Sequence, residues 1–164
     1  MLEARMSLQN SIGLQTFLAF DFGIRRTGVA TGNRLTRTAS PQPTITAHND
    51  QRIDAVALRI KEWQPDALVV GVPYHPDGAA HENTARAQKF VRQLRAKFLL
   101  QVFEVDERYT TTEAERILRE RGVRRDRWRE QIDAIAASVI LQDYLDAHKP
   151  PTALTAPDDW RDDG

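Results

Sequence analysis

The stretch FLAFDFGIRRTGVA, residues 17–30, places one acid at the end of an apolar run and then turns through two glycines with two arginines between them. The apolar residues predict a buried strand over residues 16–22. A carboxylate is costly to remove from water, so Asp21 at the end of such a strand needs a reason. Either it caps the turn at Gly23, or it is a functional carboxylate.

The rest of the chain continues in an order that is typical of an α/β domain. Residues 27–47 predict two strands that pair antiparallel with the first, with Asn33 near their turn. The apolar run 66–73 is typical of a central parallel strand, and residues 99–107 predict another. Helical spacing marks four segments, which are 50–63, 84–98, 111–121 and 127–148. The sequence therefore predicts a mixed sheet of five strands, three antiparallel and then two parallel, flanked by helices.

A chain of 164 residues suits a single domain. We expect a flexible N-terminal extension over residues 1–15, a folded domain over 16–149, and a disordered acidic tail over 150–164. No apolar run approaches the roughly 18 residues of a membrane span, and the N-terminus lacks the apolar core of a signal peptide. We therefore expect a cytoplasmic protein that does not bind membranes.

Net charge does not mark the chain as a strongly basic nucleic-acid binder, because 23 basic residues balance 23 acidic ones. The arginines are nevertheless concentrated in residues 116–130, RILRERGVRRDRWRE. Intervening acids allow a solvated face of ion pairs there. The alternative is a patch including Arg124 and Arg125 that follows a phosphate backbone. Trp128 within it is either a core anchor or a surface on which a base stacks.

A second unusual acid ends the strand predicted within residues 99–107. With a period of two, Phe103, Val105 and Glu107 share one face, whereas Asp106 lies on the other. The alternation favours Glu107 as the carboxylate that points inward. The alternative is that Asp106 and Glu107 simply begin a solvated loop.

A third acid, Asp133, opens an apolar stripe on the last predicted helix. Helical spacing aligns it with Ala136, Ala137, Ile140 and Tyr144. The small alanines permit a close approach of this helix to the sheet. An acid near the start of a helix is also explained by the helix dipole alone, so this feature by itself leaves both interpretations open.

These three acids meet at one cleft if the sheet places their strands side by side. Carboxylates sharing a small volume repel one another unless protons or cations neutralise them. The chain has no cysteine, which excludes thiolate ligands. Hard divalent ions such as Mg²⁺ or Mn²⁺ suit oxygen ligands, and a pair of such ions commonly catalyses in-line displacement at phosphorus.

Four short motifs occur in order along the chain. They are Asp21-x-Gly23-x-x-Arg26-x-Gly28-x-Ala30, Gly71-x-Pro73 with Asp77-Gly78, Asp106-Glu107-Arg108 with Thr110-Thr111 and Ala114, and Asp133-Ala134 ahead of ASVILQDYL. Together they resemble the YqgF/RuvX family over roughly residues 16–148. The resemblance implies an RNase H-like fold. Members are described as Holliday-junction resolvases and as nucleases that mature the 5′ end of pre-16S ribosomal RNA.

The resemblance also implies roles for individual residues. Asp21, Glu107 and Asp133 would be the catalytic acids that bind Mg²⁺ or Mn²⁺, as two ions. Arg26 and Arg108 would contact phosphate. Thr110 and Thr111 would either cap the helix that begins there or touch the substrate backbone.

Four functions remain open at this point. The first is a metal-dependent nuclease of structured nucleic acid, with RNA favoured over branched DNA. The second is a Holliday junction resolvase, which would need a homodimer to cut two strands symmetrically. The third is an actin-like ATPase-type phosphotransferase, although that type normally clamps its nucleotide between two domains. The fourth is a non-catalytic RNA-binding module, against which the retention of all three acids counts.

Overall fold

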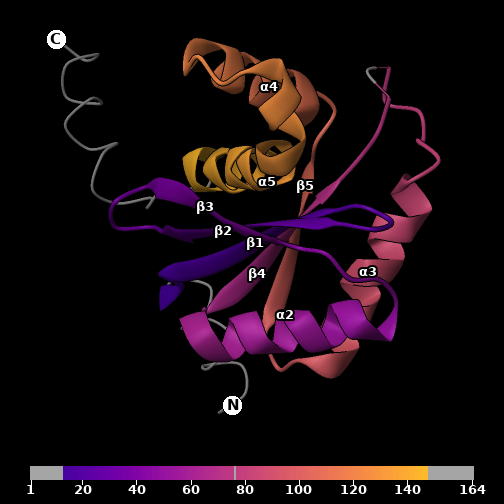
Figure 1. The fold of residues 1–164 in the computed structure, drawn as a ribbon. Coiled ribbons are helices and arrows are strands. Elements are labelled where there is room, and N and C mark those ends of the chain that lie inside the picture. Colours follow the sequence, from indigo (N-terminus) through magenta and orange to yellow (C-terminus); the bar gives the residue numbers. More distant parts are fainter. Residues whose placement is uncertain (1–12, 76, 148–164) are drawn as a thin grey trace, which may run out of the picture.

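The computed structural model describes residues 13–75 and 77–147, and it contains a central sheet covered by helices on both faces (Figure 1). The strands are β1 (Thr16–Phe22), β2 (Thr27–Asn33), β3 (Thr38–Ile45), β4 (Ala67–Val72) and β5 (Gln101–Asp106). The helices are α2 (Asp50–Trp63), α3 (Thr84–Lys97), α4 (Thr110–Glu120) and α5 (Trp128–Ala147), with a short 3-10 helix, η1 (Arg125–Arg127), before the last. Each of the four predicted helices therefore begins and ends within one residue of its predicted boundary.

The strands lie in the order β3-β2-β1-β4-β5. β2 pairs antiparallel with both β1 and β3, whereas β4 pairs parallel with β1 and with β5. This confirms the mixed sheet of three antiparallel and two parallel strands, but β3 pairs with β2, whereas the sequence predicted that it would pair directly with β1. β1 is central, so the end of β1 lies beside the ends of its two neighbours.

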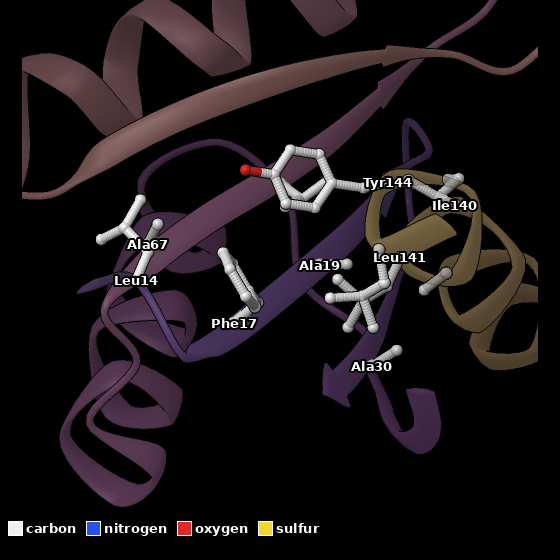
Figure 2. Packing of buried hydrophobic residues seen from close by; sticks show 11 residues of the cluster. Leu14, Phe17, Ala19, Ala30, Ala67, Ile140, Leu141 and Tyr144 are labelled. Carbon is white, nitrogen blue, oxygen red and sulfur yellow. The ribbon is translucent and has the colours of Figure 1, made fainter. Parts of the chain in front are cut away.

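Alternate residues of β1 pack on opposite faces of the sheet. Phe17 and Ala19 pack against α5, where Leu141 and Tyr144 cover them (Figure 2). Leu18 and Phe20 face the other way, into the cluster formed with α2 and α3. Helix α4 does not cover the sheet directly but packs on α5. By this alternation, the next odd-numbered residue of β1, position 21, lies on the α5 face.

The ordered core extends slightly before β1. Leu14 is buried in the cluster under α5, and the backbone N–H of Gln15 donates to Oδ2 of Asp66 at 2.9 Å. The first twelve residues of the expected N-terminal extension, and the expected acidic tail over 150–164, lie outside the described residues. No helix in the described part of the chain is long and apolar enough to span a membrane.

The backbones of β2 and α5 are in contact at Gly28, so this position has no room for even a small side chain. A methyl group at this position would overlap the carbonyl oxygen of Asp133. We expect Gly28→Ala to lower the free energy of unfolding by about 3 kcal/mol or more, because backbone must move to relieve the overlap. Gly13→Ala is the matched control, since nothing lies near position 13. Equal unfolding midpoints for the two variants in urea would contradict the contact.

Candidate active site

The three acids singled out in the sequence come from three elements. Asp21 is the next-to-last residue of β1, and Asp133 lies in the second turn of α5. Glu107 directly follows β5, where its N–H donates to the carbonyl of Val72 at 3.1 Å and extends the β4–β5 ladder by one residue. The backbone of each acid is thus held by regular secondary structure.

Glycines on both sides of Asp21 provide the space for the other two acids. In the sheet, Asp21 is in register with Gly28 of β2 and with Gly71 of β4. The backbone of Asp133 lies over Gly28, and a side chain at Gly71 would come within 2.9 Å of a Glu107 carboxylate oxygen. The row Gly28, Asp21, Gly71 therefore forms the floor of the candidate site.

The carboxyl groups of Asp21 and Glu107 share a hydrogen bond. Burial, followed by repulsion from Asp133, raises the pKa of Asp21 to about 7. Burial and the neighbouring Asp21 raise the pKa of Glu107 to about 10. The pair therefore holds a proton at neutral pH, because two ionised carboxylates within hydrogen-bonding distance of each other would repel strongly.

Among residues 13–75 and 77–147, Asp133 has a cationic partner, whereas Asp21 and Glu107 have none. Its Oδ2 lies 3.0 Å from Nε of Arg26, and Arg26 also donates through Nη1 to the carbonyl of Arg129 at 3.5 Å. Burial raises the pKa of Asp133, and the Arg26 guanidinium acts in the opposite direction. Arg26 thus ties the β1–β2 turn, residues 23–26, to the start of α5.

Arg108 lies on the other side of the acids. Its Nε is 2.8 Å from Oδ2 of Asp106, and its guanidinium lies against Gly78 in the loop that follows β4. The side chain keeps 37% of its accessible surface. Arg26 and Arg108 therefore place one partly exposed guanidinium on each side of the carboxyl pair.

The donor set fits a hard divalent cation in its chemistry. Carboxylate oxygens are the preferred ligands of such ions, and a cation would replace the proton that Asp21 and Glu107 share. Among residues 13–75 and 77–147, however, no three acidic, histidine or cysteine side chains are grouped closely enough to hold an ion as they stand. In this structure the Asp133 carboxylate is paired with Arg26, 3.0 Å away.

The two threonines of the third motif differ in exposure. Thr110 is the first residue of α4 and is buried, with its N–H donating to the carbonyl of Glu107 at 3.3 Å. Thr111 is exposed. The N-cap residue of α4 is Tyr109, which makes no side-chain capping bond, so neither threonine is the N-cap.

The arginine-rich segment is exposed and partly paired. Arg124 lies 3.1 Å from Asp126, which is the kind of ion pair that the solvated interpretation expects. Arg125 instead stacks 4.8 Å from the centre of the Trp128 ring. The indole of Trp128 donates to the carbonyl of Val123 at 2.9 Å and packs against the α4–α5 cluster, as a core anchor does.

A groove of about 950 Å³ adjoins the site and runs between α4 and α5. It begins at Asp106 and Arg108 and extends to Asp143 and Asp146. Burial raises the pKa of Asp143, and the nearby Asp146 adds to this effect. Acids at the far end make the groove a poor path for a phosphate backbone, so the arginines near the acids are better placed for that contact.

One residue near the site was missed by the sequence reasoning. Arg52 of α2 is buried, and its Nη2 donates to the carbonyls of Gly23 and Ile24 at 2.6 and 2.5 Å. A signal was available, because Arg52 lies four residues before the buried Val56 and so shares its face of the helix.

The family model and the similar proteins agree on the family of this chain. The RuvX family model, described as a Holliday junction resolvase, matches residues 15–147. A protein of Polaromonas sp. strain JS666, named "Putative pre-16S rRNA nuclease", is 65% identical over 133 residues, which cover 81% of this chain and 89% of that protein. A protein of Burkholderia lata with the same name is 53% identical over 132 residues, covering 80% and 89%.

The fold has a counterpart among solved structures. Thermus thermophilus RuvC, in a complex with a Holliday junction substrate, is 17% identical with a TM-score of 0.51, and the match covers 81% of this chain and 94% of that one. At this identity the likeness concerns the fold alone, and it confirms the RNase H-like fold expected from the sequence.

The raised pKa values of the carboxyl pair predict how stability depends on pH without metal. Both groups bind protons more tightly in the folded chain than unfolded carboxyls do, whose pKa is about 4. Their contribution to stability is therefore complete below about pH 4 and declines as the pH rises through about 7 for Asp21 and towards about 10 for Glu107.

We expect Asp21→Asn to become progressively more stable relative to the unaltered protein between pH 5 and pH 9, in a chelator. Urea unfolding across this range measures the difference. Asp54→Asn, a change at an exposed position of α2, is the matched control and should give a constant difference. Parallel stability curves for Asp21→Asn and the unaltered protein would contradict the shared proton.

Proposed function

This chain belongs to the RuvX family, and on that premise we propose that it is a divalent-metal-dependent nuclease acting on structured RNA. We further propose a role in 5′-end maturation of pre-16S ribosomal RNA. The observation that carries the nuclease proposal is the carboxyl pair of Asp21 and Glu107, with Asp133 on the facing helix and an arginine on each side. A cluster of acids flanked by arginines suits the cleavage of a polyanion.

Asp21, Glu107 and Asp133 are the residues that would hold Mg²⁺ or Mn²⁺, as two ions. Such ions, when bound, activate a water molecule and stabilise the leaving oxygen in phosphodiester hydrolysis. Asp21 and Glu107 would release the proton that they share, and Asp133 would exchange its bond with Arg26 for a ligand role. Arg26 is then free to bind a phosphate of the substrate.

The remaining proposed contacts follow from exposure and charge. Arg108 projects beside Glu107 and would bind a phosphate next to the cleaved bond. The exposed Thr111, and Arg124 and Arg125 at the α4–α5 corner, would contact the backbone further away. Thr110 belongs to the motif, but its burial limits it to positioning the start of α4.

RNA is favoured because the relatives that cover most of this chain carry the pre-16S rRNA nuclease name. The catalytic acids themselves do not distinguish ribose from deoxyribose. The second candidate is a Holliday junction resolvase, which the description of the family model favours. A resolvase would act as a homodimer, so symmetric cutting by a dimer is the result that distinguishes it. A cytoplasmic location fits either role.

Cleavage assays test the nuclease proposal directly. We expect single-stranded or structured RNA to be cut with Mg²⁺ or Mn²⁺ and not with chelator. Asp21→Asn and Asp133→Asn should each lower the rate by at least about 100-fold and leave RNA binding roughly unchanged, because each removes a ligand charge without altering shape. Asp54→Asn should cleave at the normal rate. A DNA four-way junction is assayed in parallel.

The other outcomes of these assays would each support a different function. Cleavage that survives Asp21→Asn would place the active site elsewhere. Symmetric junction cutting without RNA cutting would establish the resolvase. Binding of RNA without cleavage would favour the non-catalytic module, and ATP turnover would favour the phosphotransferase.

Arg26 is expected to contribute about one phosphate contact. Arg26→Ala should weaken RNA binding and reduce the slope of log affinity against log salt by about one. Lys61→Ala, at an exposed position of α2, is the control and should leave the slope unchanged. Titration of labelled RNA at several salt concentrations measures both. Equal slopes for Arg26→Ala and the unaltered protein would exclude the contact.

A further inference from the structure

A buried arginine lies under the turn that carries the first catalytic motif. Arg52 is only 6% exposed, although it is in the first turn of α2. Its guanidinium carbon lies 4.3 Å from the centre of the Phe22 ring and 6.0 Å from that of Phe90. Arg52 is therefore enclosed by aromatic side chains on the face of the sheet opposite the acids, where it cannot touch a substrate.

Its hydrogen bonds are directed to one short segment. A single nitrogen, Nη2, donates to the carbonyls of both Gly23 and Ile24. These carbonyls belong to the β1–β2 turn, which begins two residues after Asp21 and ends at Arg26. The bonds join α2 to this turn across 28 and 29 residues of sequence. The turn thus has one anchor at each end, Arg52 at its start and the Arg26–Asp133 ion pair at its close.

Stability alone does not explain this arrangement. Burial lowers the pKa of Arg52, and no charged group among the described residues opposes that effect. Its Nε has no hydrogen-bond partner, and neither has the buried hydroxyl of Thr27 at the other end of the turn. Burying a guanidinium without a carboxylate is costly, and the two hydrogen bonds of Arg52 and its contact with the Phe22 ring offset only part of that cost. Unsatisfied buried groups of this kind often mark positions retained for function.

We infer that Arg52 is a positioning residue: it holds the β1–β2 turn so that Asp21 and Arg26 keep the placement that cleavage requires. The part of this inference that concerns rate rests on the proposed nuclease function. Small displacements of catalytic groups have large effects on rate: a displacement of about 1 Å lowers the rate by up to about 100-fold. Arg52 therefore affects catalysis without being a catalytic residue.

The test separates positioning from folding. Arg52→Met keeps a long side chain over Phe22 and Phe90 but removes the charge and both hydrogen bonds. Arg52→Lys keeps the charge and one donor group. Lys61→Met makes the matched chemical change at an exposed position of the same helix. Four quantities are measured for each variant: the thermal unfolding midpoint, hydrogen–deuterium exchange over residues 22–28, the single-turnover rate of RNA cleavage, and the affinity for RNA.

For Arg52→Met we expect an unfolding midpoint equal to or above that of the unaltered protein, with at least about tenfold faster exchange over residues 22–28. The cleavage rate should fall by about 10- to 100-fold, and by a larger factor than the affinity. Arg52→Lys should restore part of the rate, and Lys61→Met should change none of the four quantities. A residue with only a structural role would lower the stability and the cleavage rate together. Retained stability with a lower cleavage rate therefore indicates a positioning role.

Two results would overturn the inference. One is unchanged exchange over residues 22–28 in Arg52→Met. The other is a fall in rate that follows a fall in the unfolding midpoint, with equal loss in Arg52→Lys, because the residue would then act only through global stability. If the unaltered protein cleaves neither RNA nor DNA, the proposed function fails, and the exchange measurement still decides whether Arg52 holds the turn.

Discussion

The arrangement of this molecule depends on the row of residues in which Asp21 lies between two glycines. A side chain at Gly28 would keep α5 away from the sheet, and a side chain at Gly71 would meet the carboxylate of Glu107. Because both positions lack a β-carbon, a helix and the end of a neighbouring strand approach Asp21 from two sides. The close packing of α5 on the sheet and the proximity of the acids are thus consequences of one local feature.

That proximity brings an electrostatic cost that the surrounding residues limit. Asp21 and Glu107 reduce their repulsion by sharing a hydrogen bond, and Asp133 reduces its own by pairing with Arg26. In the proposed function, divalent cations would replace each of these arrangements. The same residues therefore account for how the acids are neutralised in this structure and for a donor set whose chemistry suits a hard divalent cation.

Local sequence patterns predicted the elements well because their physical signals are short-range. The apolar spacing of α2 and of α5 marked both helices to within one residue, and the alternation in β5 indicated which face Glu107 shares with Phe103 and Val105. Long-range partners were not predictable in this way. The Arg26–Asp133 ion pair joins residues 107 positions apart. The bonds from Arg52 to the turn, and the burial of Thr110, likewise depend on packing between elements.

The sequence alone indicated the order of strands and helices along the chain, the resemblance to the family and the three candidate acids, because each depends on short patterns of neighbouring residues. Only the tertiary structure decided which groups meet. It placed the acids around the glycine row, directed Asp133 to Arg26, and buried Arg52 beneath the turn. These outcomes depend on distances between segments far apart in the chain, which are set by how α2 and α5 pack on opposite faces of the sheet.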